Sequence, residues 1–313
     1  MDVLRLLMTR TPLQFLLRAG TRRFGRVLMY HRVVDDGCSP ILRGLLSGAI
    51  TCSAFRRQLD YLGRHYQVVS LGELLAQRDD PGGKVAITFD DGYADNFLHA
   101  MPLLKARQMP ATVFMIAGLM NSGNGVWRDR LARTIADNGP ADLQLDAGGS
   151  VRTFPFEGDY GLQMKTAEQW LHGLSAQQRE AVLADQRSID EDRFLDVEEL
   201  KELERNRIKI ESHTVNHSYL PDLDGAAARR ELAESRSLLE QALGSPVDFL
   251  AYPYGGYDSQ IQALAREAGY RAALAAERGL LRPDTALFAI PRIGTREPFD
   301  RFKRRITQYY KAA

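Results

Sequence analysis

Cysteine is scarce in this chain, because Cys38 and Cys52 are the only two among 313 residues. Two cysteines exclude a disulfide framework and a cysteine metal cluster, and they fit a reducing compartment. An excess of charge of one sign is also missing, since 41 lysine and arginine residues balance 40 aspartate and glutamate residues. No overall field therefore favours nucleic acid as a partner. The 44% hydrophobic content suffices for one large α/β domain or two small ones.

A long apolar run is absent from the first 25 residues, because Arg5 and Arg10 interrupt the leucines there. No small-residue cleavage site follows, so we expect neither a secretory signal nor a membrane-spanning helix. Arginine beside leucine at helical spacing suits a helix that packs on the domain, or one that lies on a membrane surface. We therefore expect a cytoplasmic protein, with residues 1–24 as a candidate membrane contact. Liposome flotation with and without these residues distinguishes the two alternatives, and unchanged flotation would count against membrane contact.

The most informative stretch, residues 85–93, is a short apolar run that ends in two carboxylates and a glycine. Val85 to Phe89 are typical of a strand buried on both faces, and Gly92 permits a sharp turn. Adjacent carboxylates repel each other and lose hydration unless a cation or substrate lies between them. Asp90 and Asp91 are therefore either a surface helix cap or half of a metal site.

Strands and helices alternate along most of the chain, which predicts a parallel sheet or a β/α barrel. The strands expected from buried apolar runs are Arg26–Val33, Val85–Phe89, Ala111–Ala117, Ile208–Glu211, Phe249–Tyr252, Arg271–Ala275 and Phe288–Ile293. The helices expected from spacing and capping residues are Ser53–Tyr66, one opened by Ser70 and Glu73, Asp95–Met109, Asp196–Asn206, Gly225–Leu243, one opened by Asp258, and a basic C-terminal helix over 299–313.

Residues 120–195 break this alternation. A hairpin around Gly148 and Gly149 and a polar helix capped by Ser175 are expected there, with few apolar clusters. We interpret the segment as an insertion on the rim of a barrel over residues 26–298, rather than as a second core.

A pair of histidines, His213 and His217, follows another predicted strand. Histidines four apart can face one point, and the carboxyl ends of parallel strands meet at one mouth. Two imidazoles and the carboxylate of Asp91 would hold a zinc-like ion with a position left for water. Asp90, as a neighbour outside the ligand set, is then free to act as the base. Two surface histidines without a role are the alternative for this motif alone.

The two motifs together, residues 88–92 and 212–217, resemble those of the polysaccharide deacetylases, carbohydrate esterase family 4. The resemblance spans roughly Val27 to Ile293 apart from the insertion, and Tyr30-His31 resembles the N-terminal strand of the bacterial exopolysaccharide branch. It implies a distorted β/α barrel of about seven strands and hydrolysis of N-acetyl groups on amino sugars. It assigns the base to Asp90 and the metal ligands to Asp91, His213 and His217.

The third motif departs from the family pattern, because residues 251–255 read Ala-Tyr-Pro-Tyr-Gly and lack the arginine that orients the base in many members. The resemblance assigns an oxyanion contact to the backbone N–H of Tyr254, and Pro253 has no N–H to offer. Tyr252 and Pro253 are candidate substrate contacts. A proline-tyrosine-glycine turn without a role accounts for the composition equally well.

No histidine follows His217, so the general acid expected of the family is also missing. Arg292 occupies the expected region; it could orient Asp90, bind substrate or pair on the surface, but arginine is a poor acid near neutral pH. The proton for the leaving amine could come from Asp90 or from His31, and His31 could equally be a core residue.

These patterns predict a metal-dependent hydrolase that removes N-acetyl groups from an amino sugar of a bacterial polysaccharide or a lipid-linked glycan precursor. Zn²⁺ is the expected ion, with Co²⁺, Ni²⁺ and Fe²⁺ as alternatives. A catalytically inactive glycan-binding homologue is the second hypothesis, and an iron oxygenase the third. The insertion could be a lid, a glycan-binding wall or a dimer contact.

Overall fold

A parallel β-sheet lies at the centre of the computed structural model, which describes residues 23–122, 127–183, 192–295 and 298–307. Seven strands follow the order β11-β10-β9-β6-β5-β1-β12, and β4 also pairs with β5. The eight strands of the sheet, β4 included, are β1 Arg26–Tyr30, β4 Gln67–Val68, β5 Lys84–Phe89, β6 Ala111–Met115, β9 Ile208–Ser212, β10 Phe249–Ala251, β11 Ala272–Leu274 and β12 Ile293–Gly294. The expected barrel of about seven parallel strands is confirmed. The edge strands of the sheet are β11 and β12, and an isolated β-bridge joins Leu274 of β11 to Ile290, just before β12.

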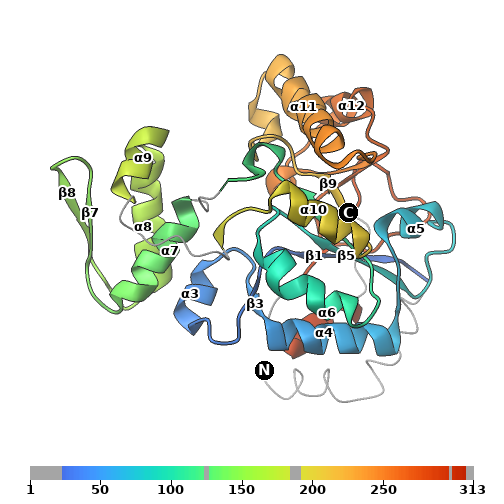
Figure 1. Cartoon of the computed structure of the whole chain (residues 1–313), viewed down its shortest axis with the longest axis horizontal. Coiled ribbons are helices and arrows are strands. Elements are labelled where there is room, and N and C mark those ends of the chain that lie inside the picture. The colour runs from blue at the N-terminus through green and yellow to red at the C-terminus, as the bar shows by residue number, and fades with distance from the viewer. Residues whose placement is uncertain (1–22, 123–126, 184–191, 296–297, 308–313) are drawn as a thin grey trace.

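Helices cover the outer surface of the sheet (Figure 1). They are α4 Cys52–His65, α5 Leu71–Ala76, α6 Met101–Lys105, α10 Val197–Arg205, α11 Gly225–Leu243, α12 Ser259–Glu267 and α13 Phe299–Thr307. In α4 the predicted apolar positions Phe55, Leu59 and Leu62 are fully buried. The capping boxes predicted at Ser70 and at Asp196 are both present.

Two of the differences between the predicted elements and the structure occur at prolines, whereas the strands expected over 26–33 and 111–117 end earlier, at Tyr30 and Met115. The helix expected over 95–109 begins as a π-helical turn, Asn96–Ala100, before α6, because Pro102 has no N–H for a regular helical bond. The strand expected over 288–293 is reduced to the bridge at Ile290 and to β12. Pro291 interrupts the strand there, and the N–H of Arg292 donates instead to the carbonyl of Glu277.

The insertion has a hydrophobic core of its own, which corrects the expectation of few apolar clusters. It contains α7 Trp127–Asn138, the hairpin of β7 Leu143–Asp146 and β8 Val151–Phe154, α8 Tyr160–His172 and α9 Ala176–Val182. Leu131, Leu143 and Leu171 are buried together with Leu42 and Leu45 of α3, Pro40–Leu45. Each short element contributes one apolar face, so the core emerges only when they pack together. Figure 1 shows the insertion projecting from one side of the barrel, with α3 between them.

A fully buried arginine joins the insertion to the barrel. Arg32, just after β1, pairs with Asp95 at 2.7 Å, with Asp129 of α7 at 3.1 Å and with Asp192 at 2.7 Å. Its guanidinium also lies over the Tyr93 ring, 4.4 Å from the centroid. Charges buried at this depth are tolerated only when they are paired, so the cluster fixes how the insertion meets the barrel.

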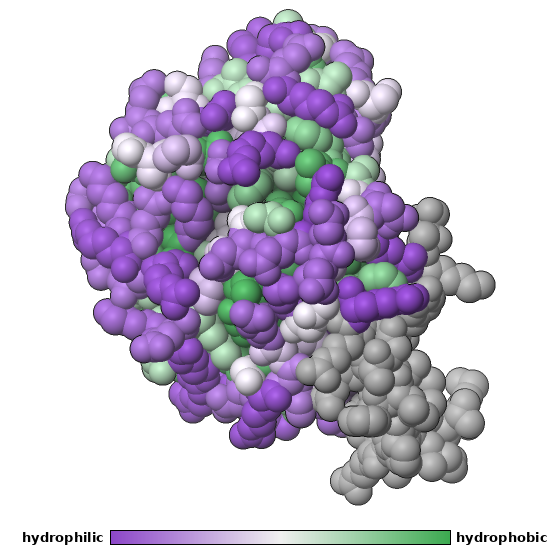
Figure 2. Space-filling view, turned by 90° about the vertical axis from the view of Figure 1, so that its right-hand side faces the viewer, coloured by the Kyte–Doolittle hydropathy of each residue, from purple (hydrophilic) through white to green (hydrophobic). Residues whose placement is uncertain are grey.

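The surface of the barrel on the side away from the insertion is largely hydrophilic, with apolar residues visible mainly in recesses (Figure 2). None of the helices in the described ranges has the length and apolar character needed to cross a membrane. Residues 1–22 and 308–313 lie outside the described residues, so the membrane contact expected for residues 1–24 stays a prediction.

Replacing Arg32 by methionine should lower the free energy of unfolding by about 3–5 kcal/mol, because Asp95 and Asp129 lose a buried counter-ion, while Asp192 keeps its pair with Arg133. Urea denaturation at neutral pH measures this loss. The matched control is Arg107→Met, whose partner Asp60 is 41% exposed, and about 1 kcal/mol or less is expected there. Equal losses in the two variants would contradict a special role for the buried cluster.

Candidate metal centre and catalytic site

A pocket of about 200 Å³ lies where the carboxyl ends of the central strands meet. β5 leads into Asp90 and Asp91, β9 leads into His213, and β10 leads into Tyr252. The residues that line the pocket are Met29, His31, Ser47, Asp90, Asp91, His213, His217, Tyr252, Tyr254, Gly255, Ala276 and Arg292. The sheet therefore brings together two motifs that are far apart in the sequence, as predicted.

Asp91, His213 and His217 form a set of three converging donors. Nε2 of His213 lies 3.6 Å from Oδ1 of Asp91, and Nε2 of His217 lies 3.5 Å from the same oxygen. One ligand atom from each residue lies within 4.8 Å of the others. This spacing and the mixture of two imidazoles with one carboxylate fit a divalent metal ion with positions left for other ligands.

The protonation of the three residues also fits a metal site, since ligands must be unprotonated. Burial lowers the pKa of His213 to about 3 and also lowers the pKa of His217, which keeps both imidazoles neutral. Nδ1 of His213 lies 2.8 Å from the carbonyl oxygen of Ala251, a contact that directs the lone pair of Nε2 toward Asp91. Burial raises the pKa of Asp91 to about 6, and nearby Asp90 adds to this effect. A bound cation would stabilise the ionised form of the buried Asp91 carboxylate.

Asp90 differs sharply from its neighbour because Arg292 holds it. The guanidinium donates two hydrogen bonds to the carboxylate, Nη1 to Oδ1 at 2.6 Å and Nη2 to Oδ2 at 2.8 Å. Burial alone would raise the pKa of Asp90, but the charge of Arg292, assisted by His213 and His31, lowers it well below its usual range. Asp90 is therefore ionised and oriented, as a general base must be.

The environment of Arg292 corrects one of the alternatives raised by the sequence. Arg292 is 1% exposed and donates to both oxygens of Asp90, so the surface pair is wrong, whereas a contact with substrate stays a prediction because Arg292 also lines the pocket. Its Nε also donates to the carbonyl of Ala275. An arginine from a distant segment thus holds Asp90, although residue 251 is an alanine.

The backbone of the site is strained. Seven non-glycine residues in the described ranges have positive φ, and four of them belong to the site: Asp91, Thr214, His217 and Tyr254. Such conformations cost energy and persist only where the surroundings impose them. The loop between the histidines is held by Thr214, whose hydroxyl accepts the N–H of His217 at 3.1 Å.

Glu231 of α11 is a positioning residue that the sequence reasoning missed. Its carboxylate accepts the N–H of Val215 at 2.9 Å, the N–H of Asn216 at 2.9 Å and the side-chain amide of Asn216 at 2.6 Å. These bonds fix the loop that carries His217. Glu231 occurs in an ordinary helical pattern, so no local signal marks it; only its burial in the folded chain does.

The remaining predicted residues have different environments. His31 lines the pocket and is partly exposed, so the core alternative for it is wrong. Tyr252 also lines the pocket, but it is 1% exposed and its hydroxyl donates to the carbonyl of Phe288, which removes that group from substrate. Pro253 is buried and is not among the lining residues. The Tyr254 ring is 71% exposed and lies 4.6 Å from the His217 ring, so it flanks the predicted metal site.

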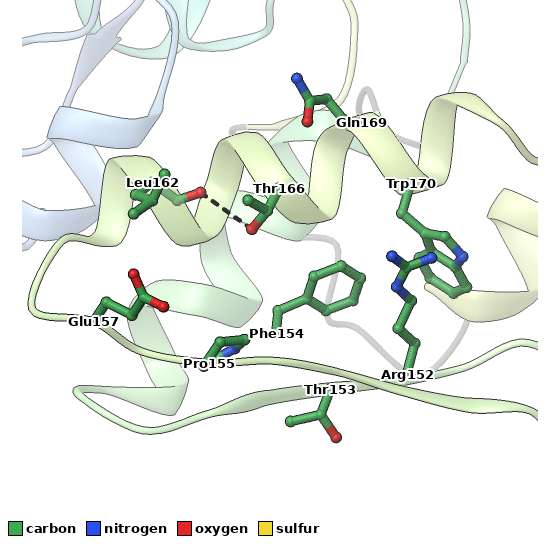
Figure 3. A pocket seen from close by; sticks show the side chains of 9 residues that line it. All are labelled: Arg152, Thr153, Phe154, Pro155, Glu157, Leu162, Thr166, Gln169 and Trp170. Carbon is green, nitrogen blue, oxygen red and sulfur yellow. Dashed lines mark hydrogen bonds between the residues drawn. The ribbon is translucent and has the colours of Figure 1, made fainter.

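A wider hollow, of about 610 Å³, lies in the insertion between β8 and α8. Figure 3 shows Phe154 and Trp170 directed into it, with Arg152 beside Trp170. It contains no histidine and no aspartate among its lining residues. We therefore place the chemistry in the smaller pocket, where donors and a base converge.

A family model described as polysaccharide deacetylase matches residues 77–146 and 163–273. The chain belongs to the polysaccharide deacetylase family. A curated relative from Bacillus subtilis, named "Putative polysaccharide deacetylase YxkH", is 25% identical over 272 residues, which cover 85% of this chain and 70% of the relative.

Two solved structures share the fold. IcaB from Ammonifex degensii is 20% identical with a TM-score of 0.61, and the match covers 91% of this chain and 96% of that one. The Streptococcus pyogenes deacetylase PplD, solved in complex with acetate, is 19% identical with a TM-score of 0.60, covering 87% and 92%.

Substituting His217 by alanine should weaken binding of Zn²⁺ more than about 100-fold, because one of three converging donors is lost. Isothermal titration of the metal-free protein with Zn²⁺ measures the affinity. His172→Ala is the matched control, since that side chain is 65% exposed on α8, and it should bind like the wild type. Unchanged affinity in His217→Ala, or no binding by the wild type, would rule out this metal centre.

Proposed function

We propose that this protein is a metal-dependent hydrolase that removes N-acetyl groups from an amino sugar of a bacterial polysaccharide or a lipid-linked glycan precursor. The observation that carries the proposal is the ionised Asp90, held by Arg292 directly beside the three donors Asp91, His213 and His217. Family membership supports the reaction class. Two imidazoles and a carboxylate suit Zn²⁺ best, with Co²⁺, Ni²⁺ and Fe²⁺ as alternatives.

A divalent ion held by Asp91, His213 and His217 would polarise the acetamide carbonyl and lower the pKa of a water molecule. Asp90 takes the proton from that water as the oxygen attacks the carbonyl carbon. The backbone N–H of Tyr254 donates to the oxygen that becomes negative. The C–N bond then breaks, and the amine nitrogen receives a proton from Asp90 or from His31, which both line the pocket. Acetate and a free amino sugar result.

The inactive glycan-binding homologue remains the second candidate, because no histidine follows His217. The Arg292–Asp90 pair favours the enzyme. The two hydrogen bonds of 2.6 and 2.8 Å keep the carboxylate of Asp90 ionised in a buried position. Burying this ion pair costs desolvation energy, and a site that only binds glycans does not need an ionised base.

Metal-loaded protein should release acetate from N-acetylated oligosaccharides or lipid-linked N-acetylated sugars, measured by an enzyme-coupled acetate assay. Asp90→Asn keeps the shape of the side chain but removes the base, so kcat should fall about 10²- to 10⁴-fold. Glycan binding without acetate, and a signal indifferent to Asp90→Asn, would support the inactive homologue instead.

Arg292→Met should shift the acid limb of the pH–kcat/KM profile to higher pH by about one to three units. Burial raises the pKa of Asp90 and Arg292 opposes it, so removing the guanidinium leaves the raising effect dominant. A base works only when unprotonated, and activity is therefore lost at a higher pH as the solution is acidified.

Arg292→Lys keeps the charge but loses the fork, so it should show a smaller shift. Thermal unfolding and Zn²⁺ content check that both variants are folded. An unmoved acid limb in folded, metal-loaded Arg292→Met would show that Asp90 is not the group that titrates.

A further inference from the structure

An exposed aromatic surface extends outward from the predicted metal site. Tyr254 and Tyr219 are 71% and 43% exposed, which is unusual for large side chains in the described part of the chain. The Tyr254 ring lies 4.6 Å from the His217 ring and 6.4 Å from the Tyr219 ring. Tyr219 rests against Gly256, where a Cβ atom would come within 2.1 Å of the tyrosine ring. Tyr219 can therefore occupy this position only because residue 256 is a glycine, and part of the tyrosine side chain faces solvent.

An ion pair of the insertion contacts Ser47, a residue that lines the same pocket. Nη1 of Arg128 donates to the carbonyl of Leu45 at 3.1 Å and to the hydroxyl of Ser47 at 3.4 Å, and Ser47 lines the pocket with Asp90 and Tyr254. Nε of Arg128 donates to Glu168 of α8 at 3.0 Å. The two side chains are 31% and 25% exposed, so part of each polar group faces solvent.

Ser47 joins the two parts of this surface, because it lines the pocket together with Tyr254 and its hydroxyl accepts a hydrogen bond from Arg128. The pocket mouth thus has aromatic rings from the barrel on one side and a polar pair from the insertion beside it.

We propose that the insertion supplies the second wall of a substrate cleft, in which Tyr219 stacks on a sugar ring while Arg128 and Glu168 hydrogen-bond sugar hydroxyls and acetamido groups. This proposal rests on the proposed function. A pyranose offers an apolar face of C–H groups and a rim of hydroxyls, which matches one aromatic and one polar wall. The polar wall carries one positive and one negative charge, so it suits a neutral chain better than a polyanion. The insertion wall would thus contact sugar units beyond the one that loses its acetyl group.

The test compares kcat and KM for N-acetylglucosamine with those for its hexasaccharide, using metal-loaded full-length protein. The wild type should prefer the hexasaccharide. Tyr219→Ala and Glu168→Gln should each raise KM for the hexasaccharide about tenfold, with a much smaller effect on the monosaccharide and on kcat. Arg229→Met is the control, because it breaks an exposed ion pair between α11 and α12, with Glu267, and neither residue lines the pocket.

Equal wild-type kcat/KM for the two substrates, or equal losses on both in the variants, would overturn the cleft. A calorimetric measurement separates the cleft proposal from the deacetylase proposal. It compares binding of the hexasaccharide to the Asp90→Asn variant with binding to the double variant that also carries Tyr219→Ala. If no acetate is released but Tyr219→Ala weakens this binding about tenfold, the deacetylase proposal fails and the cleft stands. If acetate is released but binding is unchanged by Tyr219→Ala, the cleft is wrong and the deacetylase stands.

Discussion

The bidentate contact between Arg292 and Asp90 is the interaction on which the account of the site depends. Two adjacent carboxylates are buried, and without different partners they would compete for one proton. Arg292 lowers the pKa of Asp90, while burial raises that of Asp91. The two carboxylates therefore differ: Asp90 is ionised and can act as the proposed base, whereas Asp91 faces two neutral imidazoles as a candidate metal ligand. The same division explains why the chain functions without an arginine at residue 251 in the proposed mechanism.

The strained backbone around the pocket follows from this need for convergence. Parallel strands bring their carboxyl ends to one mouth, but side chains from β5, β9 and β10 meet at a point only if the turns after them bend sharply. Positive φ at Asp91, His217 and Tyr254 provides those bends. Buried acceptors such as Glu231, and the anchoring of the insertion through Arg32, hold the surrounding loops in place. Stability of the rim and geometry of the site are therefore linked.

Much of the fold and the centre of the site could be predicted because both arise from local patterns. Buried runs such as 85–89 and caps such as Ser70 mark their elements directly. The strand-end motifs predicted that Asp90, Asp91, His213 and His217 come together, and the four residues line one pocket. The partners of these residues could not be predicted in the same way. Arg292 and Asp90 are 202 positions apart in the sequence, and they meet only because β12 and β5 both lie beside β1 in the sheet. The core of the insertion likewise forms only when its elements pack against α3. Neither leaves a periodic signal in the sequence.

The measurement that tests the central claim most directly is a crystal structure of the Zn²⁺-loaded protein with anomalous scattering data at the zinc edge. The account predicts one ion about 2.0–2.2 Å from a carboxylate oxygen of Asp91 and from Nε2 of His213 and His217. It also predicts that Asp90 stays outside the ligand set with Arg292 still bound to both of its oxygens. An ion ligated by Asp90 with Arg292 displaced, or an ion bound elsewhere while the three donors remain empty, would contradict it.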